Sequence, residues 1–340
     1  MKRMIAGASI VAVAVFAAGL LQRDAFAADA LPTRHADPSR TSVSGLSSGA
    51  FMAVQYAVAY SSGVVGVGVV AGGPYDCAFV TTGFTTGCRS GTPSGALSLA
   101  AAQGFEALGQ IDPLRGLSQM KVYLFTGTRD ETVRAAVVGA TRDFFAAAGV
   151  PAKHIAFVGK VPAGHAFIAP DFGNACGETA PPYVSHCAVG GHAYDQPKAI
   201  LQYIHGPLKA AVTTLSSTVR PFDQTPFGSA ATSLDTVGFV YVPKVCETAA
   251  GHCAVHVVFH GCRQGAQSVG SDVYKSVGYN RWADSNRLIV LYPQVVTTSL
   301  LQGNPEGCWD WWGYTGPTFA VRSGVQLSAV KAMVDRLTAP

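Results

Sequence analysis

Short runs of β-branched and apolar residues alternate with longer segments of helical periodicity, and this alternation restricts the fold of the 340-residue chain more than any other feature. The predicted strands cover residues 41–44, 64–73, 121–127, 154–159, 237–243, 256–261 and 287–293. The predicted helices cover residues 50–60, 141–149, 279–286 and 325–337. Such alternation favours an α/β fold, with a mostly parallel sheet flanked by helices. A Ser-, Thr- and Pro-rich segment at 213–233 is predicted to connect two halves of the chain.

The first 27 residues have the pattern of a secretory signal peptide. Lys2 and Arg3 precede the apolar run MIAGASIVAVAVFAAGLL, and Ala25-Phe26-Ala27 supplies an A-x-A cleavage site. A membrane anchor is the alternative, because the run is near the length that spans a bilayer. The cleavage site favours export, so we expect residues 28–340 to form a single domain in the periplasm or outside the cell.

The charge balance of the exported part excludes one class of partner. Three of the 24 basic and one of the 20 acidic residues precede residue 28, which leaves a net charge of +2. So small an excess gives no basis for a nucleic-acid partner. With 49% hydrophobic residues the chain has ample material for a core, and we expect a monomer without stable membrane insertion.

All eight cysteines lie after residue 28, and an even number in an exported protein predicts disulfides. Proximity in the sequence suggests three pairs, which leaves two cysteines for a long-range pair. The resulting pairs are Cys77–Cys88, Cys176–Cys187, Cys246–Cys253 and Cys262–Cys308. A zinc site is the competing interpretation, but the chain has no CxxC motif and its cysteine spacings are irregular.

The stretch GLSSG fits the pattern G-x-S-x-G, with Ser47 at its centre. A predicted strand precedes it and a predicted helix follows, which is the setting of a nucleophilic serine on a tight turn. The flanking glycines relieve crowding, and the helix N-terminus adds free amides and a positive dipole end. We therefore predict Ser47 as a nucleophile, with Ser48 and Ser44 as alternatives and a plain small-residue turn as the non-catalytic interpretation.

Two later segments offer a base and its orienting carboxylate. In α/β-hydrolases the triad acid and histidine follow the serine in that order, each on a loop after a strand. Asp130 follows the predicted strand at 121–127, with Glu131 beside it as a rival, and His165 follows the strand at 154–159. Position selects Asp130 as the triad acid, and it selects His165 as the base over the other histidines. Those are His35, His154, His186, His192, His205, His252, His256 and His260.

An oxyanion hole usually combines the backbone amide after the nucleophile with an amide from a second loop. The segment HVVFHGCRQG predicts that second donor at the amide of Cys262. A strand end closed by a disulfide is the structural alternative, and both interpretations can hold together. This loop normally precedes the nucleophile in the chain, whereas here it follows the whole triad. The order becomes regular if the two halves of an α/β-hydrolase are exchanged, so we predict a circularly permuted fold.

Seven segments spread over nearly all of residues 28–340 carry a family resemblance. They are SGLSSGAFMAVQ, GTRDETV, AGHAF, FHGCRQ, YNRWAD, LYPQ and GNPEGCWDWWGY. In sequence and order they resemble poly(3-hydroxybutyrate) depolymerases with the permuted catalytic domain. The resemblance implies Ser47 as nucleophile, His165 as base and Asp130 as triad acid. It also implies an oxyanion hole from the amides of Ser48 and Cys262.

The resemblance implies a polyester of 3-hydroxyalkanoate as substrate, cleaved through an acyl-enzyme, with no metal or organic cofactor. Many extracellular members continue into a linker and a polymer-binding domain, whereas this sequence ends at Pro340. We therefore expect soluble, amorphous or oligomeric substrate, or polymer binding by an aromatic surface of the catalytic domain. In CWDWWGY, Trp309 is predicted to contact substrate, while Trp311 and Trp312 are left open between core and surface.

Two other functions fit the same motifs. A secreted esterase for feruloyl or short-chain acyl esters would use the same triad, because the shape of the pocket sets the acyl preference. A non-catalytic binding protein would instead use the aromatic loop on a degraded hydrolase scaffold. The presence of every expected triad residue favours an enzyme.

Overall fold

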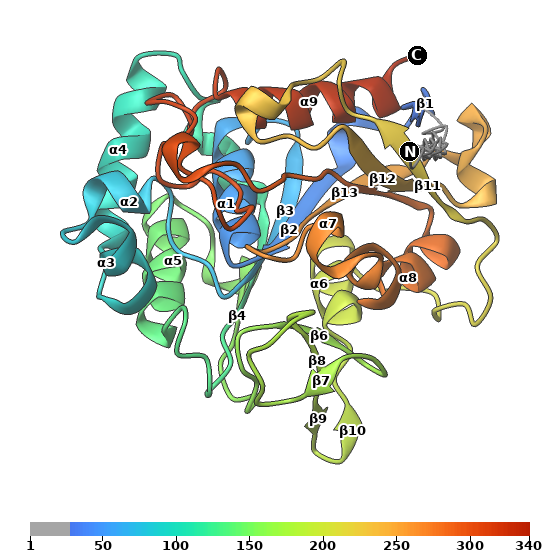
Figure 1. Ribbon diagram of the computed structural model, residues 1–340, viewed down its shortest axis with the longest axis horizontal. Coiled ribbons are helices and arrows are strands. Elements are labelled where there is room, and N and C mark those ends of the chain that lie inside the picture. The colour runs from blue at the N-terminus through green and yellow to red at the C-terminus, as the bar shows by residue number, and fades with distance from the viewer. Residues whose placement is uncertain (1–27) are drawn as a thin grey trace, which may run out of the picture.

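A sheet of nine strands runs through the computed structural model, which describes residues 28–340 (Figure 1). The predicted signal peptide lies outside the described residues. The spatial order of the strands is β1-β11-β12-β14-β13-β2-β3-β4-β5. Their bounds are β1 Asp29–Ala30, β2 Thr41–Leu46, β3 Val64–Val70, β4 Lys121–Phe125, β5 Ile155–Val158, β11 Val219–Asp223, β12 Val237–Tyr241, β13 Ala254–Phe259 and β14 Leu288–Tyr292.

The six strands from β14 to β5 are parallel to one another, whereas β12 runs antiparallel to both β14 and β11. The α/β fold with a mostly parallel sheet is thereby confirmed. Strand β2 is fully buried between β13 and β3, at the centre of this parallel block. In parallel strands the carboxyl ends meet at one edge of the sheet, so the loops after β2, β4 and β13 come together there.

Helices cover both faces of the sheet (Figure 1). Their bounds are α1 Ser48–Ala59, α2 Cys77–Val80, α3 Phe84–Ser90, α4 Gly95–Ala107, α5 Ala135–Ala147, α6 Gln196–His205, α7 Ala266–Val269, α8 Tyr279–Asn286 and α9 Val325–Thr338. Helix α1 packs on β2, β3 and β13 and touches α9, while α6 packs on β3 and β4 and α8 on β14. No helix within residues 28–340 is long and apolar enough to cross a membrane.

Each of the seven predicted strands overlaps a strand of the sheet. The segment predicted as a connection at 213–233 contains β11, so that prediction was wrong for its middle part. Its proline, Pro221, is tolerated because β11 lies near the sheet edge and pairs with β1 only through Phe222 and Asp223. Two small sheets, β6-β8-β7 and β9-β10, were not predicted. Their bounds are β6 Phe167–Ala169, β7 Asn174–Ala175, β8 Val184–His186, β9 Ala188–Val189 and β10 His192–Ala193.

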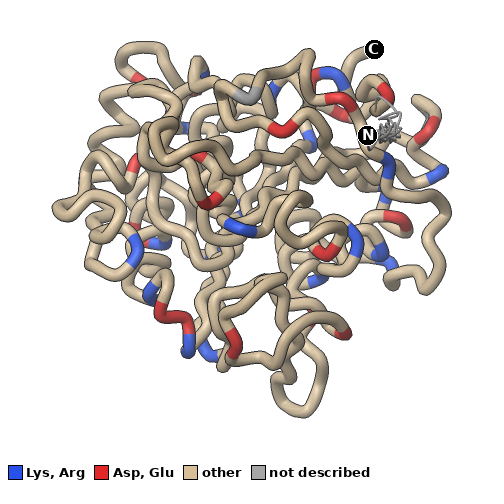
Figure 2. Tube along the Cα trace, viewed as in Figure 1, with Lys and Arg blue, Asp and Glu red and all other residues tan. Residues whose placement is uncertain are grey.

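The predicted cysteine pairing is the one in the structure, where all eight cysteines form the four disulfides Cys77–Cys88, Cys176–Cys187, Cys246–Cys253 and Cys262–Cys308. The zinc interpretation therefore has no free thiolate ligand. Basic and acidic residues are interspersed along the described trace (Figure 2).

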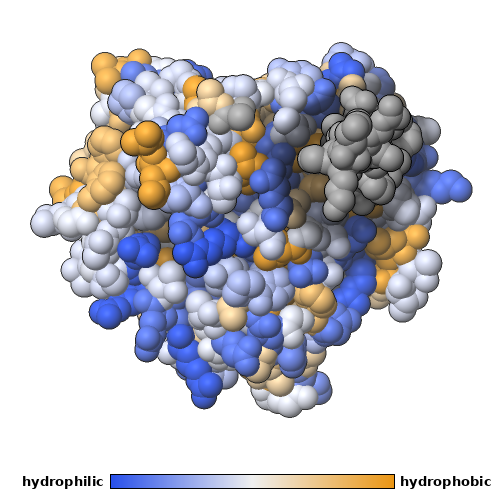
Figure 3. All heavy atoms as spheres, in the orientation of Figure 1, coloured by the Kyte–Doolittle hydropathy of each residue, from blue (hydrophilic) through white to orange (hydrophobic). Residues whose placement is uncertain are grey.

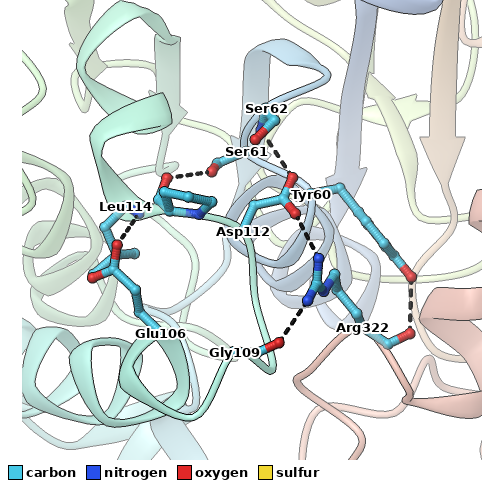
Figure 4. A network of polar contacts seen from close by, with 9 residues as sticks. Tyr60, Ser61, Ser62, Glu106, Gly109, Asp112, Leu114 and Arg322 are labelled. Carbon is cyan, nitrogen blue, oxygen red and sulfur yellow. Dashed lines mark hydrogen bonds and ion pairs between the residues drawn. The ribbon is translucent and has the colours of Figure 1, made fainter.

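A polar network ties the loop after α4 to the segment before α9 (Figure 4). Arg322 forms an ion pair with Asp112, at 3.1 Å, and donates a hydrogen bond to the carbonyl of Gly109. Asp112 also accepts a bond from the backbone N–H of Ser62, and Tyr60 donates to the carbonyl of Arg322. These contacts join the end of α1, the loop after α4 and the segment before α9.

Candidate active site

Ser47 lies on a sharp turn between the end of β2 and the start of α1. Its φ of 56° and ψ of −124° fall in a region that non-glycine residues rarely adopt. A Cβ on Gly45 would come within 2.2 Å of the Gly49 carbonyl oxygen, and one on Gly49 within 2.4 Å of the His260 carbonyl oxygen. The chain can therefore turn this tightly only with glycine at both positions, which explains the sequence GLSSG.

His165 and Asp130 form a buried pair. The Nδ1 of His165 lies 2.8 Å from Oδ2 of Asp130, and the two side chains are only 7% and 1% exposed. The other carboxylate oxygen of Asp130 accepts 2.9 Å hydrogen bonds from the backbone N–H groups of Thr132 and Val133. Glu131, the rival carboxylate, is exposed. Asp130 is thus held by its own loop and presents one oxygen to the imidazole.

Ser47 and His165 line one cavity of about 610 Å³. The other lining residues come from the end of β2, from α1 and α3, from the loops after β4 and β13, from residues 179–183, and from residues 306–308 with the adjoining aromatic segment 309–314. They are Leu46, Ser48, Phe51, Phe84, Thr85, Arg89, Thr132, Val133, Thr179, Tyr183, Gly261, Cys262, Arg263, Glu306, Cys308, Trp311 and Trp312. Every predicted triad and oxyanion-hole residue thus lines this cavity except Asp130, which follows β4 at the same edge of the sheet and pairs with Nδ1 of His165.

The loop after β13 lies against the nucleophile turn. A Cβ on Gly261 would be 3.4 Å from that of Ser47. The Oε1 of Gln264 accepts the N–H of Gly261, and its Nε2 donates to the carbonyls of Pro182 and Tyr183. Within residues 28–340 the N–H of Cys262 donates no hydrogen bond, and that of Ser48, first residue of α1, has no acceptor in its own helix. Both amides are therefore available to an oxygen in the cavity.

His260 supports this loop as a neutral ring. Its Nδ1 lies 2.7 Å from the Gly261 carbonyl, and its Nε2 lies 3.2 Å from the N–H of Val295. A carbonyl only accepts and an N–H only donates, so the proton is on Nδ1. Burial lowers the pKa of His260 to about 4, which keeps this arrangement at neutral pH.

Trp309 does not reach the cavity, so the prediction of a substrate contact there was wrong. The ring is fully buried and packs edge-on against Phe259, with 5.0 Å between centroids. The neighbouring Trp311 and Trp312 line the cavity instead. Trp311 stacks on Phe51 of α1 at 4.3 Å, which fixes its ring as a wall.

Asp310 shapes this aromatic segment, and sequence reasoning gave it no role. Its buried carboxylate accepts hydrogen bonds from the backbone N–H groups of four residues, Trp312 to Thr315, and from the Thr315 hydroxyl. Its own N–H and carbonyl bind Gln326 and Gln55. The sequence signal for this role was an aspartate shortly before Gly313, because an aspartate side chain can accept hydrogen bonds from the backbone N–H groups of the turn that follows it.

Two curated relatives decide the family. A poly(3-hydroxybutyrate) depolymerase of Delftia acidovorans is 39% identical over 315 residues, which are 91% of this chain and 61% of that protein. A polyhydroxybutyrate depolymerase of Talaromyces funiculosus is 39% identical over 92% of this chain and 93% of its own length. The chain belongs to the poly(3-hydroxybutyrate) depolymerase family. No protein-family model matches it.

The fold of this depolymerase-family chain is also that of solved members. The crystal structure of the depolymerase from Penicillium funiculosum superposes with a TM-score of 0.83 at 36% identity, over 91% of this chain and 99% of that one. A serine-to-alanine variant solved in complex with a trimer of R3HB superposes equally well. The circular permutation stays a prediction, because these likenesses do not test it.

Proposed function

We propose that this protein is a secreted serine esterase that hydrolyses poly(3-hydroxybutyrate) or related polyhydroxyalkanoates to oligomers and monomers. The observation that carries the proposal is the strained Ser47 turn, which shares a cavity with His165, whose ring is paired with the buried Asp130. The same cavity belongs to a chain 39% identical to depolymerases over more than nine-tenths of its length.

In the proposed mechanism the Ser47 hydroxyl attacks the ester carbonyl and His165 takes its proton. The tetrahedral intermediate collapses, and His165 returns the proton to the departing alkoxide, which leaves an acyl group on Ser47. Water then attacks the acyl-enzyme with His165 again as base, and the hydroxy acid is released. Asp130 holds the proton of the imidazole on Nδ1, so that Nε2 is the acceptor.

The amides of Ser48 and Cys262 are proposed to bind the oxyanion. Each donor of this kind contributes about 3 kcal/mol to the stabilisation of the transition state. The disulfide to Cys308 and the bond from Gly261 to Gln264 support this role, because they hold the peptide of Cys262 from both sides. The loop then needs little reorganisation during the reaction.

Aromatic rings offer a surface for the aliphatic ester chain. Trp311 and Trp312 line the cavity, and Phe84 continues the wall to the outside, where it is 45% exposed. Phe79 lies 6.0 Å from Phe84 between ring centroids and is 56% exposed. These side chains belong to the α2–α4 side of the molecule, at the left of Figure 3, where apolar residues gather at the surface. We propose that polymer is bound there.

Secretion is supported by the four disulfides, which form and persist in oxidising compartments. The reaction as proposed needs no metal or organic cofactor, and we propose that the protein acts as a monomer. Among residues 28–340 no group of three or more His, Cys, Asp or Glu side chains could hold a metal ion.

The substrate class is tested by assaying the purified protein on amorphous poly(3-hydroxybutyrate) and on feruloyl and short-chain acyl esters in parallel. We expect release of 3-hydroxybutyrate or its oligomers from the polymer and weak turnover of feruloyl esters. Turnover of feruloyl esters with no soluble product from any polyester would replace the proposal with the carboxylesterase alternative.

A further inference from the structure

The cavity holds an uncompensated positive charge. Besides His165, its charged lining residues are Arg89, Arg263 and Glu306. Arg263 and Glu306 form an ion pair, with 2.7 Å between Nη2 and Oε1, and their backbones are joined by a further 2.7 Å hydrogen bond. Arg89 is exposed and has no acidic partner within residues 28–340. A neutral polyester chain gives no electrostatic reason for a free guanidinium at this wall.

Arg89 lies on the Asp130 side of the cavity. Its carbonyl accepts a 2.8 Å hydrogen bond from the N–H of Arg134. The two residues before Arg134, Thr132 and Val133, donate their N–H groups to the Asp130 carboxylate. Cys88, which precedes Arg89, forms a disulfide with Cys77 and so anchors the end of α3. The guanidinium is therefore attached to a backbone that is bonded to the loop holding Asp130, the partner of His165.

The direction of the ester relates this position to the substrate. When a linear 3-hydroxyacyl oligomer is cleaved, the acyl part retains the free hydroxyl end and the departing alcohol part retains the free carboxylate end. His165 protonates the departing alkoxide in the proposed mechanism, so the alcohol part leaves from beside the His165 ring. Arg89 lines the same cavity, and its backbone is bonded to the loop that holds Asp130, the partner of His165.

We propose that Arg89 binds the free carboxylate of a short 3-hydroxyacyl oligomer and so favours cleavage close to that end. A guanidinium matches a carboxylate with two parallel N–H···O bonds, which gives orientation as well as attraction. The inference rests on the proposed triad, and it concerns the choice among substrates rather than the chemistry. Long polymer, whose ends are scarce, would be cleaved without this contact.

The test compares a linear trimer of (R)-3-hydroxybutyrate with its methyl ester, which lacks the negative charge of that end and gains a methyl group; only cleavage of the internal ester bonds is counted. For the wild type we expect kcat/KM to be about five- to tenfold higher for the free acid, the size of a partly exposed charge-assisted contact. Arg89→Gln should lower the value for the acid about five- to tenfold and that for the ester by much less, so that the preference for the acid is lost. Arg89→Lys should keep part of the preference.

Arg134→Gln is the matched control, because it removes the same charge from an exposed neighbour that does not line the cavity. It should retain the preference for the free acid. Equal rates on both trimers for the wild type, or an equal loss on both for Arg89→Gln, would overturn the proposal. A loss of the preference for the free acid in Arg134→Gln would overturn it too, since the preference would then come from the net positive charge of the region and not from a contact with Arg89. Failure of the triad itself would show separately, as methyl-ester hydrolysis that survives Ser47→Ala.

Discussion

Two residues, Ser47 and Asp76, adopt backbone conformations that are unfavourable for residues other than glycine. Ser47 and Asp76 both have positive φ, at 56° and 52°, and neither is glycine. For Ser47 the strain accompanies the proposed chemistry, since it exposes the hydroxyl at the strand edge. For Asp76, at the start of α2, the consequence concerns stability, because its carboxylate is also buried.

Asp76 is expected to make the stability of the protein depend on pH. Burial raises the pKa of Asp76 from its ordinary value of 3.8 to about 7. Between these two values the folded state keeps a proton that the unfolded state has lost, so the free energy of unfolding falls as pH rises. Asp76→Asn should remove this part of the dependence, and asparagine tolerates the positive φ.

Denaturant unfolding of wild type and Asp76→Asn at pH 4.5 and pH 8 measures the effect. The decrease in free energy of unfolding between these pH values should be smaller in the variant by about 2–4 kcal/mol. Parallel curves for the two proteins would show that Asp76 is ionised over the whole range.

At the scale of elements, the aromatic segment 309–314 divides its rings between two tasks. Trp309 contributes to the core beneath the loop after β13, whereas Trp312 is half-buried at the cavity wall. Trp309→Ala should therefore lower the free energy of unfolding by about 3–5 kcal/mol, as large-to-small changes in a core do. Trp312→Ala should lower it by about 1 kcal/mol or less but reduce hydrolysis of polymer about tenfold.

Urea unfolding and polymer hydrolysis of the two variants distinguish these tasks. A destabilised Trp312→Ala together with a stable Trp309→Ala would contradict the assignment of the rings.

The sequence predicted elements well where a pattern had a single structural meaning. Buried runs such as that at 287–293 became central strands, and the expected pairing of cysteines was correct. Helix α6 was missed although Asp195 caps it and Pro197 lies in its first turn. Strand β11 was missed because it includes a proline and two charged residues and buries only Phe222 fully, so its pairing partners, not its composition, make it a strand.

The proposed triad residues were predicted correctly in position, whereas the aromatic residues that line the cavity were not. Ser47, Asp130 and His165 follow from motif and order, and the structure brings them to one edge of the sheet. The orientation of three tryptophans within four positions could not be predicted, because density of aromatic residues carries no information about which ring faces inward. The disulfide of Cys308 to Cys262 draws the adjacent Trp309 beneath the β13 loop, and that contact links residues far apart in the sequence.

For the whole molecule, the disulfides divide between local and long-range constraints. Cys262–Cys308 spans 46 residues and joins two walls of the cavity, whereas Cys246–Cys253 spans only 7. In the chain-entropy account, removal of the first should cost about 4 kcal/mol and removal of the second about 2.4 kcal/mol. The double variants Cys262→Ala/Cys308→Ala and Cys246→Ala/Cys253→Ala test this by urea unfolding.

The first double variant should also lose most of its hydrolytic activity under conditions where it is still folded, because the Cys262 amide is no longer held. The second should keep its activity. Equal activity in both folded variants would mean that the long-range disulfide contributes stability alone.

The proposed acyl-enzyme mechanism requires Ser47 as the nucleophile. Its most direct test is the rate of 3-hydroxybutyrate release from amorphous polymer by Ser47→Ala and by Ser48→Ala. The neighbouring serine is the matched control, since its hydroxyl only accepts a bond from the Trp309 N–H while its proposed role belongs to the backbone amide. We predict a loss of about 10⁴- to 10⁶-fold for Ser47→Ala and retention of most activity by Ser48→Ala. Hydrolysis by Ser47→Ala at the wild-type rate would contradict the mechanism.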